Sequence, residues 1–203
     1  MNGFHLDEET HTYRLDGHPL PSPSSVFQDL GLVDSRWYKP EDRARGRAVH
    51  AGLHYALKGT LEWGSLHQDL HGYVRSGLLW IERCRPVIKR METSLYHPIH
   101  RFAGTFDVEW ELDGWFWIVD FKSGKAPKVA RYQTAAYAMM ASNPGTTRPH
   151  KRAALELFED GSLANLVTYD DHTDGAGWLN LLGAYRIRQS LHKPNLASGQ
   201  PGE

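Results

Sequence analysis

The dipeptide Asp113-Gly114 most constrains the fold, because it stands between two segments rich in β-branched and aromatic residues. Asp-Gly favours the tight type I′ turn, which joins two antiparallel strands through a two-residue loop. Such a turn sets Leu112 opposite Trp115 and fixes each pair further out, since a slip of one residue would move every side chain to the other face. The same register places Asp107 directly opposite Asp120.

These two carboxylates indicate a site with its own chemistry. Opposed side chains lie about 4.5–5.5 Å apart at Cβ, and two carboxylates at that separation repel each other unless positive charge lies nearby. The segment WFWIV is apolar throughout, yet the strand continues into Asp120 and Lys122. Two carboxylates and a lysine supply oxygen ligands for a divalent cation and a fixed positive charge for a phosphate. The alternative is that both acids cap strand ends beside a lysine that pairs with them.

The pattern of hydrophobic and turn residues along the rest of the chain predicts a fold of mixed α/β class, more specifically α+β. Alternation and turn residues predict an antiparallel meander over 87–96, 102–112 and 115–121, and a later hairpin over 153–158 and 163–169. Helical periodicity and capping predict helices over 40–57, 66–85, 129–141 and 177–191. The N-terminus reads as a small hairpin over 4–20, followed by a short helix that Ser22 caps.

Composition limits the number of domains. The chain has 203 residues, of which 40% are hydrophobic and 23% charged, as in ordinary globular proteins. We expect residues 1–192 to form one domain. The tail 193–203 holds turn formers and small polar residues with nothing to bury, so we expect it to be disordered.

Composition also limits the compartment and the partners. The single Cys84 excludes an intramolecular disulfide and a four-cysteine iron–sulfur or zinc site, which indicates a reducing compartment. No secretory signal or membrane-spanning run is visible, so we expect a cytoplasmic protein of a bacterium or a phage-infected host. The formal net charge of -1 gives no general attraction to nucleic acids, so any such contact needs a local basic surface.

Further polar residues can converge on the acidic pair. His50 lies on the first long helix, Glu92 lies on the strand before the hairpin, and both are metal-ligand types. Gln133 and Tyr137 stand four residues apart, so they project from one face of the helix that follows Lys122.

Two sets of basic residues are candidates for phosphate contact. Arg43 and Arg47 share a stripe of the first long helix with His50, while Lys125 belongs to a series in which every third position is basic, namely Lys122, Lys125, Lys128 and Arg131. Either set would attract a phosphate backbone. A solvated basic surface is the alternative for both.

Taken in order, five motifs resemble those of the RecB-like branch of the PD-(D/E)XK nucleases: GRAVH, the glutamate of METSLYH, GTFD, DFKSG and YQTAAYA. The match spans about residues 46–137. The resemblance implies a restriction-endonuclease-like core, in which helices flank a central mixed β-sheet. It also implies that Mg²⁺ or Mn²⁺ is bound by His50, Asp107, Asp120 and the backbone carbonyl of Phe121.

The same resemblance assigns roles to the other motif residues. Lys122 would be catalytic, Glu92 would be a further carboxylate of the site, and Gln133 and Tyr137 would lie near the DNA. The absence of a cysteine set places the chain with the members that lack an iron–sulfur cluster.

The N-terminal segment HTYRLDGHPLPSPSSV is similar to the segment that precedes the core in phage-type exonucleases of this branch. This resemblance implies a DNA exonuclease of recombination, repair or replication, with a single-strand annealing or binding protein as a further partner. Two alternatives remain: a non-catalytic DNA-binding subunit, and a structure- or site-specific endonuclease. The motifs leave strand preference, polarity and oligomeric state open, because they contact metal and phosphate alike.

Overall fold

The structure is a computed structural model that describes residues 3–10, 12–33, 40–142 and 150–192, without the side chains of Pro40 and Arg43. Its N-terminal part is a three-stranded antiparallel sheet formed by β1 (Phe4–Asp7), β2 (Thr12–Leu15) and β3 (His18–Leu20). The predicted hairpin is β2–β3, and β1 adds a strand that the prediction missed. The reason is a second turn, in which the Thr10 amide donates to Asp7 Oδ1 at 3.0 Å.

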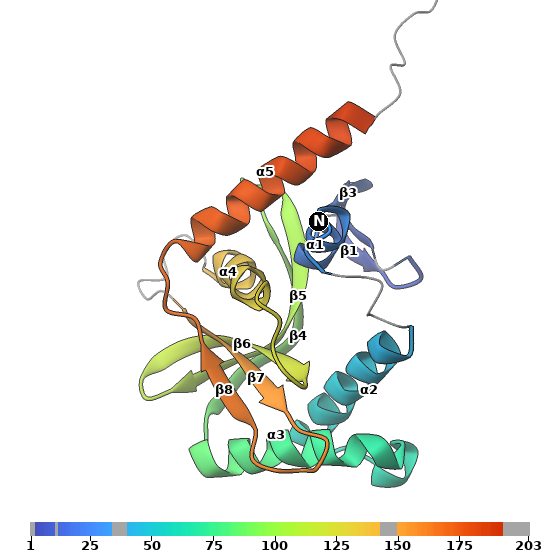
Figure 1. Cartoon of the computed structure of the whole chain (residues 1–203), viewed down its shortest axis with the longest axis vertical. Helices are drawn as coiled ribbons and strands as arrows, with labels where there is room; N and C mark the ends of the chain where they lie inside the picture. The colour runs from blue at the N-terminus through green and yellow to red at the C-terminus, as the bar shows by residue number, and fades with distance from the viewer. Residues whose placement is uncertain (1–2, 11, 34–39, 143–149, 193–203) are drawn as a thin grey trace, which may run out of the picture.

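A five-stranded sheet forms the centre of the molecule, in the order β4-β5-β6-β7-β8 (Figure 1). Its first three strands, β4 (Val87–His97), β5 (Phe102–Leu112) and β6 (Trp115–Ser123), form the predicted antiparallel meander. Leu112 pairs with Trp115 as predicted, and the turn residues Asp113 and Gly114 have the positive φ values of 52° and 73° that this turn requires.

The sheet is mixed because β7 (Lys151–Leu157) runs parallel to β6, with Lys122 beside Glu156 in the register. A parallel neighbour needs a crossover, and α4 (Ala130–Ala141) lies between the two strands in the chain. The antiparallel strand β8 (Asn165–Thr168) completes the predicted second hairpin with β7.

Four further helices surround the sheet: α1 (Pro23–Asp29), α2 (Pro40–Leu57), α3 (His71–Cys84) and α5 (Asp174–His192). Ser22 caps α1 as predicted, in a reciprocal capping box with Ser25. The prediction placed the start of α3 five residues too early, at residue 66. Two short 3-10 turns, Trp63–Ser65 and Gln68–Leu70, precede it because His71 Nε2 bonds the carbonyls of Trp63 and Leu66.

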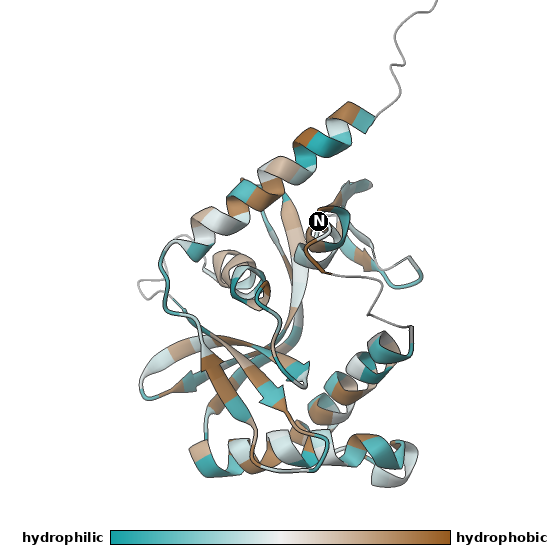
Figure 2. Ribbon diagram, in the orientation of Figure 1, coloured by the Kyte–Doolittle hydropathy of each residue, from teal (hydrophilic) through white to brown (hydrophobic). Residues whose placement is uncertain are grey.

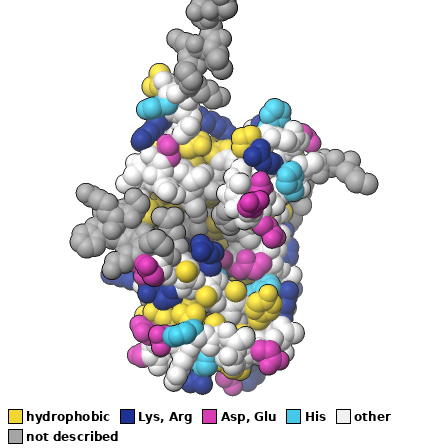
Figure 3. All heavy atoms as spheres, turned by 90° about the vertical axis from the view of Figure 1, so that its right-hand side faces the viewer, with side chains coloured by type: hydrophobic (Ala, Val, Ile, Leu, Met, Phe, Trp, Pro, Cys, Tyr) yellow, Lys and Arg dark blue, Asp and Glu magenta, His cyan; other side chains and the backbone are white. Residues whose placement is uncertain are grey.

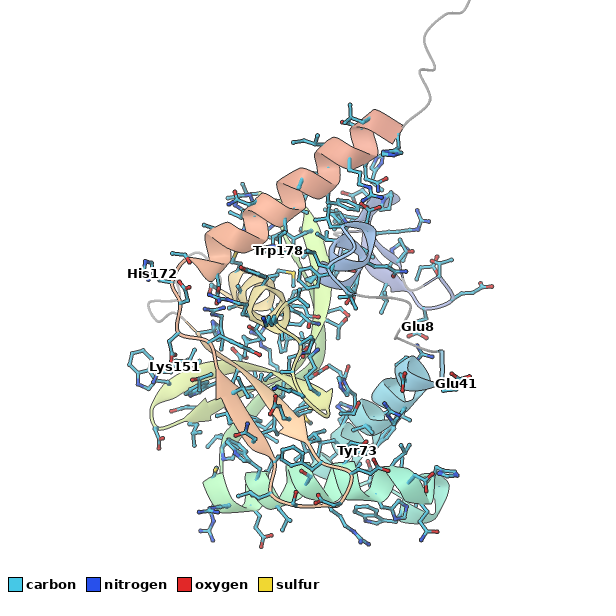
Figure 4. The ribbon with its side chains drawn as sticks, in the orientation of Figure 1. Glu8, Glu41, Tyr73, Lys151, His172 and Trp178 are labelled. Carbon is cyan, nitrogen blue, oxygen red and sulfur yellow. The ribbon has the colours of Figure 1, made fainter. Side chains whose placement is uncertain are left out.

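Two apolar clusters lie on opposite faces of the central sheet (Figure 2). One joins α2 and α3 to β5, β6 and β7, around the fully buried Val49, Leu53 and Trp110. The other joins α1, α4 and α5 to the sheet, with Trp178 of α5 directed into it (Figure 4). The result is a helix–sheet–helix sandwich. A Cβ on Gly77 of α3 would lie 2.9 Å from Leu53 Cδ2, so the missing side chain lets α3 approach α2 closely.

None of the described helices is both long and apolar enough to cross a bilayer. The tail 193–203, expected to be disordered, lies outside the described residues.

A buried ionic cluster ties α5 to α4 and β7. Asp174 is 1% exposed and pairs with Arg131 Nε at 2.5 Å and Arg152 Nη2 at 2.9 Å. We expect Asp174→Ala to lower the free energy of unfolding by about 3 kcal/mol, because it leaves two arginines without their buried partner. The exposed neighbour Asp171 also pairs with Arg131, and Asp171→Ala should cost about 1 kcal/mol or less. Urea unfolding of both variants tests this ranking, and equal losses would contradict it.

Candidate functional site

Two buried carboxylates form the centre of the candidate site, at the point where β5 and β6 separate. The two strands are paired as far as Val108 and Val119, in the register that the turn predicted, so Asp107 and Asp120 are the next residue of each strand beyond the last pair. Asp107 is 8% exposed and Asp120 is 3% exposed. Asp107 Oδ2 accepts a hydrogen bond of 2.6 Å from the amide of Phe121, so a side chain of β5 holds the backbone of β6.

His50 reaches this pair from α2. Its Nδ1 lies 3.2 Å from Asp107 Oδ1, and its ring packs edge-on against Phe121 at 6.1 Å between centroids. The position of the helix follows from Val49 and Leu53, which are fully buried in the cluster beneath it. The predicted convergence of His50 with Asp107 is confirmed.

Lys122, Gln133 and Tyr137 form a polar chain on the other side of Asp120. Lys122 Nζ lies 2.5 Å from Asp120 Oδ2 and donates to Gln133 Oε1 at 3.0 Å, while Gln133 Nε2 donates to Tyr137 Oη at 3.0 Å. Gly104 of β5 makes room for the ring, because a Cβ there would lie 2.8 Å from Tyr137 Cε1. The structure therefore places the helix pair beside the lysine, as the sequence predicted.

Glu92 faces the same place from β4 in an unusual backbone conformation. Met91 pairs with Val108 and Thr93 with Phe106, so Glu92 stands opposite Asp107. Its φ is 45°, in the left-handed region that residues other than glycine rarely adopt. Its side chain lines a cavity of about 480 Å³ together with His50 and Asp107. Strain of this kind costs about 1–3 kcal/mol and is common at functional sites.

The acids of the site differ in their titration. Burial raises the pKa of Asp120; the positive charge of Lys122 opposes this rise, and the charge of Asp107 adds to it. Burial would raise the pKa of Asp107 as well, but His50 and the Phe121 amide hold it below its ordinary value. The pKa of His50 is raised, since the attraction of Asp107 outweighs the burial that lowers it. Partial burial, followed by the charge of Asp107, raises the pKa of Glu92 to about 7.

The basic residues predicted to contact phosphate differ in their position relative to the site. Arg47 is exposed and lines the cavity of Glu92 and a second one of about 810 Å³. Lys125 is exposed in the turn after β6 and lines neither of these cavities. Arg43 lies on α2, but its side chain is outside the described residues. Arg131, the last member of the series of basic residues, forms ion pairs with Asp171 and Asp174.

One buried carboxylate next to the site was missed. Glu156 of β7 lies beside Lys122 in the parallel register; its Oε1 accepts from the Ala126 amide at 2.8 Å and its Oε2 from Asn165 Nδ2 at 3.0 Å. It therefore anchors the turn that connects Lys122 to α4. The one feature of the sequence that could have indicated Glu156 is its position as a glutamate within the apolar run of β7. Its neighbour on β6 could not be predicted, because a parallel pairing sets it and no short motif encodes that pairing.

The donor set suits a divalent cation such as Mg²⁺ or Mn²⁺. Two carboxylates, an imidazole and the Phe121 carbonyl are of the types that bind these ions. Asp120 Oδ2 is buried and has no partner in hydrogen-bonding geometry among the described residues, although Lys122 Nζ lies close. Within the described residues, no three His, Cys, Asp or Glu side chains stand together as a preformed metal centre. His50 and Asp107 are instead bonded to each other.

No protein-family model matches the chain, and no curated protein sequence matches it.

The raised pKa of Glu92 predicts a pH-dependent stability. Because the folded state holds this proton more tightly than the unfolded chain, the stabilisation is complete below the ordinary pKa of 4.5 and is lost as the pH rises through about 7. With a chelator present, Glu92→Gln should be more stable than the wild type by about 1 kcal/mol at pH 8, a figure reduced because solvent reaches the side chain. The two proteins should be equally stable at pH 4.

Denaturant unfolding at both pH values measures this difference. Equal stability of the two proteins at pH 8 would contradict the placement of Glu92 beside Asp107.

Proposed function

We propose that this protein is a metal-dependent DNA exonuclease with the restriction-endonuclease-like core of the PD-(D/E)XK nucleases. The observation that carries the proposal is the contact network His50–Asp107 and Asp120–Lys122–Gln133–Tyr137, which joins two buried carboxylates to a lysine at the end of one strand. The mixed sheet with helices on both faces supports the same core.

Each residue of the site would have a separate role in phosphodiester hydrolysis. Asp107, Asp120, His50 and the Phe121 carbonyl would hold Mg²⁺ or Mn²⁺, which supplies an activated water and neutralises charge on the phosphate. Lys122 brings a fixed positive charge to the phosphate and can donate a proton to the leaving oxygen. Gln133 orients the lysine by accepting from its Nζ, and Tyr137 orients Gln133 in turn. Glu92 adds a carboxylate on the opposite side of Asp107 that can accept a proton from water.

The preference for an exonuclease rests on the N-terminal resemblance, and partners and pathway follow from it. The proposed substrate is linear DNA in bacterial or phage recombination, repair or replication, with a single-strand annealing or binding protein as a companion. A non-catalytic DNA-binding subunit would not need a lysine paired with a buried aspartate at 2.5 Å. A site-specific endonuclease would read base edges with a further element.

The test is digestion of end-labelled linear DNA and covalently closed circular DNA with Mg²⁺, with Mn²⁺ or with a chelator. We expect metal-dependent loss of the linear DNA alone. Asp120→Asn and Lys122→Ala should each lower the rate at least about 100-fold, because both act on charge that develops in the transition state.

The matched control is Glu111→Gln, which removes a carboxylate from the same strand as Asp107. Glu111 pairs with Lys89 and its side chain is 38% exposed, so this variant should keep the wild-type rate. Cut circles would indicate an endonuclease instead. Undiminished cleavage by Lys122→Ala, or the absence of any cleavage by the wild type, would refute the proposal.

A further inference from the structure

Two cavities next to the candidate site share one wall. The cavity of about 480 Å³ contains His50 and Asp107, and the cavity of about 810 Å³ contains Lys122 and Gln133. Both are also lined by Ser22, Ser24 and Arg47. These volumes lie within the range of about 300–1,000 Å³ that ligand pockets occupy. The cavities are therefore adjacent spaces of nucleotide size, and residues of the candidate site line both of them.

The opposing walls come from elements far apart in the sequence. The N-terminal sheet and α1 contribute Tyr13 and Ser24, while α2 contributes Arg47 and Tyr55. Figure 1 shows this N-terminal unit above α2, both at the right-hand side of the view. Figure 3 views the molecule from that side, where acidic, basic and histidine side chains are intermixed. A ligand in the cavities would be held between two separate parts of the fold.

The smaller cavity has walls suited to a base and a sugar. Tyr55 is 51% exposed and its ring lies edge-on to His54 with 5.7 Å between centroids, so one aromatic face of α2 is available for stacking. Across the cavity, Tyr13 Oη and Thr105 Oγ1 are 2.8 Å apart and form a hydroxyl pair. Stacking and hydroxyl contacts of this kind serve any nucleotide, whatever its base.

The outer rim of the larger cavity opposes a second strand. Glu8 and Glu9 line it from the turn between β1 and β2, and both are exposed; Glu8 is labelled in Figure 4. DNA duplex carries one negative charge per about 1.7 Å of its axis, and both of its backbones would have to pass this entrance. The only basic side chain at the junction of the two cavities is Arg47, among the residues described there. Arg47 can neutralise the phosphates of one DNA strand, whereas Glu8 and Glu9 would repel the phosphates of a second strand.

We propose that the two cavities are consecutive nucleotide subsites for one single strand of DNA, which passes the junction of Ser24 and Arg47 with its scissile phosphate between Asp107 and Lys122. The inference rests on the proposed nuclease function for the identity of the central phosphate. The path itself is a binding property, and duplex DNA enters it only after its strands separate.

The experiment measures binding without cleavage. Fluorescence anisotropy with a labelled twelve-nucleotide thymidine strand and with a blunt duplex of the same length, both in chelator, compares the two ligands on the intact chain. We expect the single strand to bind at least about tenfold more tightly. Ser24→Trp fills the junction and should weaken single-strand binding at least about tenfold, and Tyr55→Ala should weaken it at least about fivefold through lost stacking.

Two surface variants serve as matched controls. Ser162→Trp adds the same indole at an exposed serine of the β7–β8 connection, and Trp115→Ala removes an exposed aromatic ring at the β5–β6 turn. Both should bind like the wild type. Equal or tighter binding of duplex, or wild-type binding by both Ser24→Trp and Tyr55→Ala, would overturn the proposal.

A cleavage assay with Mg²⁺ separates the two proposals. Selective single-strand binding that Ser24→Trp weakens, without cleavage by any metal, would support the strand path and refute the nuclease function. Metal-dependent digestion of blunt duplex as fast as single strand would support the nuclease function and refute the path.

Discussion

The arrangement of the site depends on the repulsion between two carboxylates that are buried side by side. Asp107 and Asp120 would not both ionise at this depth without compensation. The structure compensates each acid from a different direction, with His50 and the Phe121 amide on Asp107 and with Lys122 on Asp120. Each compensating group comes from an element that must pack correctly, so the charge balance of the site is linked to the packing of both faces of the sheet.

The strand β6 carries both Asp120 and Lys122. It is antiparallel to β5 on one edge and parallel to β7 on the other. Its last residues leave β5 while they remain paired with β7, which opens space beside Asp107 and keeps Lys122 held. Glu156 anchors the turn that follows, so the start of α4 and with it Gln133 keep their distance from the lysine. A lysine on an exposed strand end would sample many rotamers, whereas this one is held by two polar partners.

The sequence allowed prediction of those parts of the site that local rules determine. The turn at Asp113-Gly114 fixes a register, so the opposition of Asp107 and Asp120 followed by counting, and helical spacing placed Gln133 on the same face as its partner Tyr137. The parallel pairing of β7, the start of α3 and the left-handed backbone of Glu92 were beyond such rules. Each depends on contacts between residues distant in the chain or on strain that the whole fold sustains.

The close approach of α2 and α3 at Gly77 has a consequence for how such a site can diversify. Gly77 of α3 sits against Leu53, which lies one helical turn beyond His50 on α2. The glycine therefore lets α3 pack closely against α2, the helix that carries His50. Substitutions at this helix crossing would move His50 relative to the two aspartates while every side chain of the site is retained, so the geometry of the site could change through the spacing of two helices rather than through its own residues.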